Sequence, residues 1–237
     1  EAAGATTLYA DGGNWFSHGA FASRSNLTGP LWLIPAGVLD PDERATDFLL
    51  KTNQYPMTLD NAALSQPYYC RHDVAHLLRG EVAAYLRLYY NQLTALQDRE
   101  TRTFWEHYFH AGQHKTHEEA WFLLQTRWML YREDGPDLRL LSGIPRAWFE
   151  HGREIRIRGM KSYFGTLDLR ARSDLDRGRI TIEAAMTGPS LPRRLLVRVP
   201  HPRRLRAAAC AGGAYEPARE LATVEPFTGS ARLVLTF

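Results

Sequence analysis

The sequence predicts an α+β chain in which a helical portion, residues 1–136, precedes an antiparallel β-sandwich or sheet, residues 137–237. Apolar residues recur at helical spacing up to about residue 135 and at every second position from about residue 138. Runs of helices followed by runs of strands indicate an α+β chain or two packed modules. The composition, 44% hydrophobic and 23% charged, is that of a globular chain and excludes wholesale disorder, collagen and a coiled coil.

The helical portion contains a strong start signal at Asp40. This residue suits an N-cap, and the proline and two acids that follow it suit the first turn of a helix that reaches about residue 53. Apolar spacing predicts a second helix over residues 66–79, with an interruption near Gly80, and a third over residues 81–97.

A fourth helix is expected from Thr116 onward. Thr116 and Glu119 fit a capping box, and the apolar residues that follow point in almost every direction round the helix axis. Such a helix is expected to be buried on most sides, as an inner helix of a large α-helical assembly would be. The helices of this chain are too few to cover it, so further helices are expected upstream.

Strands are expected where polar and apolar residues alternate. The alternating segments are residues 153–158, 167–172, 179–184, 195–199 and 231–237. Turn signals rich in glycine and proline separate them. This pattern predicts an antiparallel sheet or sandwich with one face in water.

Charge and hydropathy limit the classes of partner. The net charge is only +3, and the arginine-rich residues 193–206 contain no interleaved aromatic residues, so nucleic-acid binding is not expected. The apolar runs are far shorter than a membrane span. No targeting signal is visible, so the compartment cannot be inferred from the sequence.

The densest group of polar and aromatic residues lies at residues 103–119. Sugar chemistry needs an aromatic ring that stacks on a pyranose, which Trp105 offers, and donors for hydroxyl groups, which His114 and His117 offer. A metal site built from the histidines here is an alternative. Their spacing lacks the His-Glu-x-x-His pattern of zinc hydrolases, so we expect no metal and interpret them as groups that bind substrate or backbone.

The same stretch supplies the candidate general acids. Glu106 lies between an aromatic residue and a histidine and has no capping role, so it is the first candidate. Glu118 is the second candidate, and its alternative role is to stabilise the positive end of the helix dipole.

A second polar and aromatic cluster opens the helix expected at residues 66–79. Tyr69, Arg71, His72 and Asp73 would face a ligand rich in hydroxyl groups or negative charge, with Asp73 as a candidate base. The alternative is aromatic packing together with a surface ion pair between Arg71 and Asp73.

Several stretches of this chain carry a resemblance to a known family. They are Phe-Trp-Glu-His at 104–107, His-Lys-Thr-His-Glu-Glu-Ala-Trp-Phe at 114–122, Gln-Thr-Arg-Trp-Met-Leu-Tyr at 125–131, and residues 140–148, 162–165 and 226–229. Together they resemble the C-terminal half of bacterial glycoside-hydrolase-like proteins with an (α/α) six-hairpin toroid and a β-sandwich tail. The resemblance implies an incomplete toroid portion over residues 1–136, a β tail over 137–237, and a chain that is a C-terminal fragment.

The resemblance implies glycoside hydrolysis of an oligo- or polysaccharide by carboxylic acid and base, without a cofactor. No family motif assigns individual residues, so the site rests on the chemistry of the two clusters. One alternative is a polysaccharide lyase of the toroid-plus-sandwich type, in which Tyr69, Arg71 and His72 act on a uronate. Another is a carbohydrate-binding protein without a working acid pair.

Overall fold

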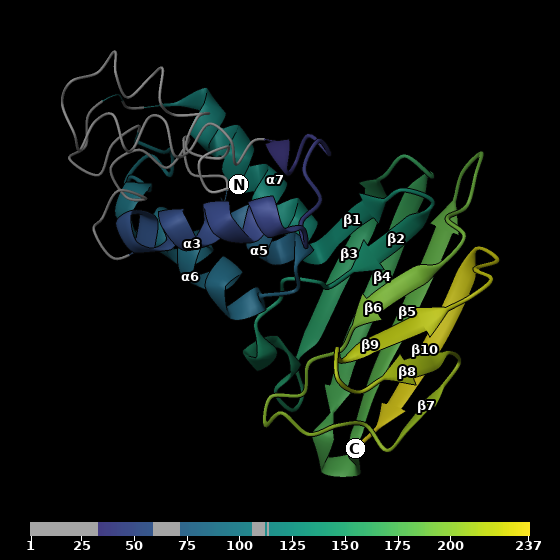
Figure 1. Cartoon of the computed structure of the whole chain (residues 1–237). Coiled ribbons are helices and arrows are strands. Elements are labelled where there is room, and N and C mark those ends of the chain that lie inside the picture. The colour runs from purple at the N-terminus through teal and green to yellow at the C-terminus, as the bar shows by residue number, and fades with distance from the viewer. Residues whose placement is uncertain (1–32, 59–71, 106–111, 113) are drawn as a thin grey trace. The chain divides into compact units, whose positions relative to one another are not determined.

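The structure, a computed structural model, describes residues 33–58, 72–105, 112 and 114–237 (Figure 1). Side chains at residues 52–58 and at position 72 lie outside the description. The chain divides into two compact units, Glu1–Thr126 and Arg127–Phe237. We describe each unit by itself.

The described part of the first unit is helical. Its helices are α3 (Arg44–Thr58), α5 (His72–Leu78), α6 (Val82–Leu96) and α7 (Thr116–Leu130), the last of which extends into the second unit. The helix predicted to start at Asp40 begins instead at Arg44, and Asp40 stabilises the turn before it: its carboxylate accepts the N–H of Asp42 at 2.8 Å and its carbonyl accepts the hydroxyl of Thr46 at 2.6 Å. The predicted interruption is confirmed, since Gly80 adopts a φ of +75° directly after α5.

The predicted helical toroid portion is wrong. The described residues form only four α-helices of at most 15 residues, together with two five-stranded sheets, and no toroid is shown. The described chain is therefore mostly β.

The prediction that α7 is buried on most sides is also wrong. Leu123 is 69% exposed and Leu124 is 39% exposed, although both belong to the apolar set of this helix. An apolar side chain can remain exposed in a folded protein. Apolar residues on every side of a helix therefore do not show that other elements pack against every side of it. The predicted capping box differs as well, because the carboxylate of Glu119 accepts the N–H of Phe104 at 3.4 Å.

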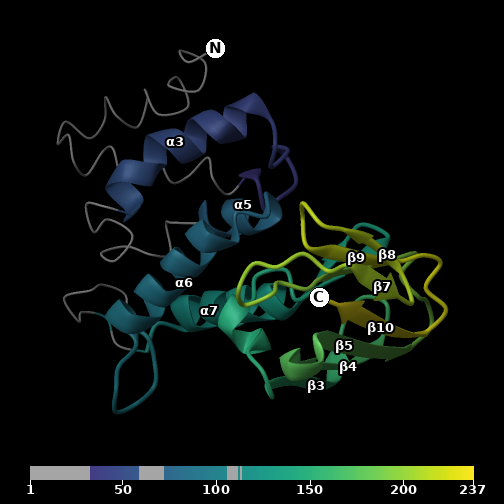
Figure 2. The same cartoon turned by 90° about the horizontal axis from the view of Figure 1, so that it is seen from below.

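The second unit is built from two five-stranded sheets (Figures 1 and 2). The first has the order β1 (Tyr131–Asp134), β2 (Asp137–Leu140), β6 (Leu195–Arg198), β9 (Leu221–Val224), β8 (Ala214–Glu216). The second has the order β3 (Glu154–Lys161), β4 (Thr166–Asp174), β5 (Arg179–Thr187), β10 (Ser230–Thr236), β7 (Ala209–Ala211). Neighbouring strands are antiparallel except β2 and β6, which are parallel.

The alternation predicted from the sequence is visible in the burial of the second sheet. Along β5, Ile180, Ile182, Ala184 and Met186 are buried, and the residues between them are exposed or half-buried. β4 alternates in the same way, with Leu167 among its fully buried residues. One face of this sheet therefore forms the core, and the charged residues of β3, β4, β5 and β10 gather on the other face.

Within the described residues, no helix is both long enough and apolar enough to cross a membrane.

Candidate functional site

Backbone hydrogen bonds at Phe104 join the two ends of the stretch rich in tryptophan and histidine in the first unit. We call this place the Phe104 junction. The carbonyl of Phe104 accepts the N–H of Lys115 at 3.1 Å, and its N–H donates to the carboxylate of Glu119 at 3.4 Å. The N–H of Trp105 donates to the carbonyl of Leu96 at 2.9 Å. The chain therefore leaves α6 and enters α7 at neighbouring positions, joined by backbone hydrogen bonds.

Three of the predicted sugar-binding residues lie at or close to the Phe104 junction. Trp105 is half-buried, and His114 and His117 are exposed. His114 has a φ of +57°, in the left-handed region, one residue before the hydrogen bond that closes the stretch. Glu106, the first candidate acid, lies outside the described residues.

The second candidate acid, Glu118, is in the interior of the helical unit. Its exposed fraction is 0%, and its Oε2 accepts a hydrogen bond of 3.1 Å from the side-chain amide of Gln92. Its Oε1 lies 3.7 Å from Nε2 of His117. A substrate in solvent does not reach this carboxylate in the structure.

Asp73 is buried as well, with an exposed fraction of 2%. Its carboxylate accepts a hydrogen bond from the side-chain amide of Gln125, and the carbonyl of Gln125 accepts the hydroxyl of Tyr85 at 2.8 Å. Burial, together with the charge of Asp73, raises the pKa of Tyr85 far above its ordinary value. Tyr69 and Arg71 lie outside the described residues, as does the side chain of His72.

The two buried carboxylates lie at separate contacts of α7: Glu118 accepts from Gln92 of α6, and Asp73 of α5 accepts from Gln125. Gln92 meets Glu118, and Tyr85 meets Gln125, so α6 and α7 run antiparallel with matched spacings of seven residues. Seven residues of α-helix span about 10 Å. Glu118 and Asp73 are therefore bound by different amides and do not form one hydrogen-bonded acid–base pair.

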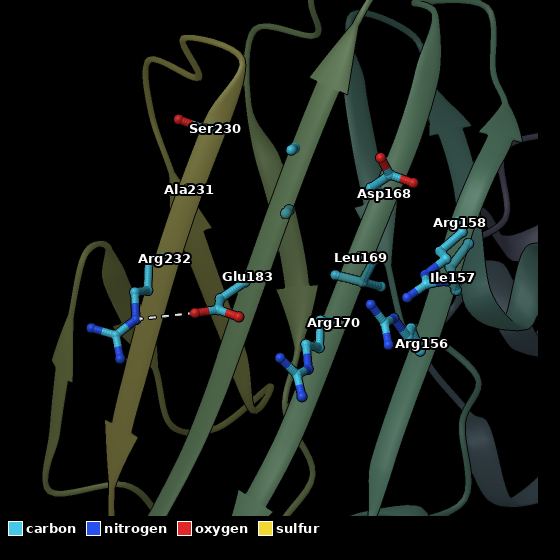
Figure 3. A pocket seen from close by; sticks show the side chains of 12 residues that line it. Arg156, Ile157, Arg158, Asp168, Leu169, Arg170, Glu183, Ser230, Ala231 and Arg232 are labelled. Atoms are coloured by element: carbon cyan, nitrogen blue, oxygen red, sulfur yellow. Dashed lines mark ion pairs between the residues drawn. The ribbon is translucent and has the colours of Figure 1, made fainter.

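A second candidate site, which the sequence analysis did not identify, lies on the outer face of the second sheet (Figure 3). A groove of about 580 Å³ crosses β3, β4, β5 and β10. The strand register places Arg156, Arg170, Glu183 and Arg232 in one row across these four strands. This row contains three guanidinium groups and one carboxylate.

The carboxylates of the groove already have partners. The pair Arg232–Glu183 is 3.4 Å long, and Oδ1 of Asp168 accepts the N–H of Gly159 at 2.8 Å. Arg170 forms a 2.9 Å ion pair with Glu154 at the groove's edge, and this hydrogen bond lowers the pKa of Glu154.

Two arginines of the groove have no such partner. Within the part of the chain that the structure describes, the side chains of Arg156 and Arg158 form no hydrogen bond or ion pair. The buried Nε of Arg170 also lacks an acceptor there. The groove therefore presents two exposed guanidinium groups, those of Arg156 and Arg158, that no carboxylate of the described residues hydrogen-bonds.

A smaller hollow of about 450 Å³ lies next to the groove, because Glu154 of the hollow forms an ion pair with Arg170 of the groove. It is lined by Ala147, Trp148, Glu150, Arg153, Glu154 and Ile155. The half-buried indole of Trp148 offers an apolar surface next to charged side chains.

Among the described residues, no group of three or more His, Cys, Asp or Glu side chains is placed to hold a metal ion. His107 and His110, which the alternative metal site would need, lie outside those residues. Comparisons of this chain with protein-family models, with curated proteins and with solved structures find no match.

Proposed function

We propose that this chain is a glycoside hydrolase that acts on an oligo- or polysaccharide, with Glu106 as the general acid. The observation that supports it is the Phe104 junction, which brings the backbone at Trp105 close to the backbone at the exposed His114, just before α7. An aromatic ring and donors for hydroxyl groups are what a sugar subsite requires. The resemblance described above supports the same chemistry.

The proposed reaction needs no cofactor. Glu106 would protonate the glycosidic oxygen of the leaving group, and Trp105 would stack on the sugar ring. His114 and His117 would donate hydrogen bonds to hydroxyl groups. Glu118 and Asp73 are buried, so we propose no direct catalytic step for them.

The burial of two of the three candidate acids favours one second function. If Glu106 does not act as an acid, the chain would bind carbohydrate without cleaving it. The two functions make different predictions for turnover and the same prediction for binding.

The test measures the release of reducing ends from neutral and acidic polysaccharides by the full chain and by Glu106→Gln. We expect the substitution to lower turnover by about 100-fold or more and to leave sugar affinity near that of the wild type. The matched control is Glu100→Gln, which changes an exposed glutamate nearby and should keep full turnover.

Three results would contradict parts of this proposal. Full turnover in Glu106→Gln would remove this residue from the mechanism. Sugar binding of equal affinity in both proteins, with no turnover in either, would establish the binding function. Ultraviolet absorbance from an unsaturated product, without hydrolysis, would instead identify a lyase.

A further inference from the structure

We propose that the groove on the outer face of β3, β4, β5 and β10 binds an acidic polysaccharide. Its guanidinium groups, those of Arg156, Arg158 and Arg170, would hold the carboxylates or sulfates of the polymer (Figure 3). This site lies wholly within the second unit, and it does not rest on the proposed hydrolysis.

Unsatisfied donors are the first argument for an anionic ligand. Within the described residues, Arg156 and Arg158 form no side-chain hydrogen bond or ion pair, and the buried Nε of Arg170 has no acceptor. The planar guanidinium group binds carboxylates and sulfates through parallel hydrogen bonds. An anion in the groove would accept hydrogen bonds from the exposed guanidinium groups of Arg156 and Arg158.

The shape of the groove is the second argument, and it favours a polymer over a small ion. Small residues that point outward, Ala185 and Ser230, leave a hollow between the arginines of β3 and Arg232 of β10. Four neighbouring strands span about 14 Å from the first to the last. A groove of about 580 Å³ is much larger than a single phosphate or sulfate needs.

The carboxylates at the groove distinguish a polysaccharide from a nucleic acid. Glu154, Asp168 and Glu183 would repel a continuous phosphate backbone, whereas they can accept hydrogen bonds from sugar hydroxyls. No aromatic side chain lines the groove itself, as a site that stacks successive bases would require. The neighbouring hollow at Trp148 would suit one further sugar ring.

The experiment measures binding of the full chain to polygalacturonate, a polymer of uronate, by affinity electrophoresis and calorimetry. The test variant is Arg156→Ala/Arg158→Ala. The matched control is Arg203→Ala/Arg206→Ala, which removes the same charge from exposed positions outside the groove. We expect binding to weaken about ten-fold in the test variant and by less than about two-fold in the control.

A third protein keeps the test independent of charge and folding. Arg156→Lys/Arg158→Lys retains both charges and loses the planar donors, so we expect affinity between those of the wild type and the alanine variant. Thermal unfolding of all variants checks that the sheet is intact.

Three further polymers, neutral galactan, dextran sulfate and single-stranded DNA, define the ligand class. We expect no binding of neutral galactan, and the tighter of polygalacturonate and dextran sulfate identifies carboxylate or sulfate as the recognised group. Tighter binding of single-stranded DNA would overturn the proposal in favour of nucleic acid. Equal losses in the groove and control variants, or absence of binding to both acidic polysaccharides, would also overturn it. Because hydrolysis is measured through Glu106, either proposal can fail without the other.

Discussion

Glu118 accepts a hydrogen bond of 3.1 Å from the side-chain amide of Gln92, and its carboxylate is fully buried. A residue that the sequence offers as a catalytic acid thus connects α7 to α6. Between the same two helices, the ring of Tyr89 of α6 stacks on the ring of Phe122 of α7, with centroids 5.1 Å apart. The interface therefore combines aromatic packing with buried polar contacts, and its predicted role is structural.

Glu118→Ala should lower the free energy of unfolding by about 2 kcal/mol, because the amide of Gln92 would lose its buried acceptor. Urea unfolding followed by circular dichroism measures this change. Glu100→Ala removes an exposed glutamate and should change stability by less than about 0.5 kcal/mol. Equal stability of the two variants would contradict a structural role for Glu118.

Tyr85→Phe should destabilise the helical unit by about 1–2 kcal/mol. The substitution removes the buried hydrogen bond that the hydroxyl donates to the carbonyl of Gln125 at 2.8 Å. Tyr90→Phe is the control, because Tyr90 is 41% exposed and its loss of a hydroxyl should cost little. The two unfolding midpoints in urea can be compared directly, and a cost for Tyr90→Phe as large as that for Tyr85→Phe would argue against this interpretation.

The stability of the second unit should depend on Asp137 at acid pH. The guanidinium of Arg194 hydrogen-bonds this buried carboxylate and lowers its pKa, so the ionised form stabilises the folded state. This contribution is present above the pKa of about 3.9 of an unfolded aspartate and is lost as the pH falls through the lower folded value.

The wild type should therefore exceed Asp137→Asn in unfolding free energy at pH 7, and the difference should shrink below about pH 4. Thermal unfolding across this pH range measures it. Asp176→Asn, at a side chain that is 81% exposed, should show a small difference at every pH. A gap between wild type and Asp137→Asn that stays constant with pH would exclude this ion pair as its source.

Gly212→Ala should destabilise the second sheet by about 3 kcal/mol or more. Gly212 has a φ of +91°, and a Cβ there would lie 2.0 Å from the carbonyl oxygen of Arg232, within the backbone of β10. Gly135 also has a positive φ, +57°, but no atom lies within 4 Å of its added Cβ, so Gly135→Ala should cost about 1 kcal/mol. Comparable losses in the two variants would show that conformation, and not the close approach, limits position 212.

Predictions that depended on neighbouring residues in the chain agree with the structure. The break at Gly80 and the alternation along β5 were both predicted, and the start signal at Asp40 lies just before the helix that begins at Arg44. Caps, turns and side-chain periodicity act over a few residues, so a sequence displays them directly. The toroid prediction failed because it inferred the surroundings of α7 from its composition, and Leu123 is exposed.

For the candidate sites too, the outcome depended on whether the residues are close together in the sequence. Backbone hydrogen bonds at Phe104 join the two ends of the stretch that contains Trp105 and His114, and the role of these residues and of His117 in sugar binding stays a prediction. The groove was not predicted, because Arg156 and Arg232 become members of one row only through the order in which β3, β4, β5 and β10 pair. The local sequence of a strand does not determine which other strand pairs with it.

The sequence by itself determined that helices precede strands and which face of β4 and β5 is apolar, because these properties follow from the spacing of side chains along the chain. Only the tertiary structure decided that Glu118 and Asp73 are buried on amide partners, while Arg156 and Arg158 form no side-chain hydrogen bond or ion pair with the described residues. Burial and charge pairing depend on side chains contributed by distant segments, and these meet only when the helices pack and the strands pair.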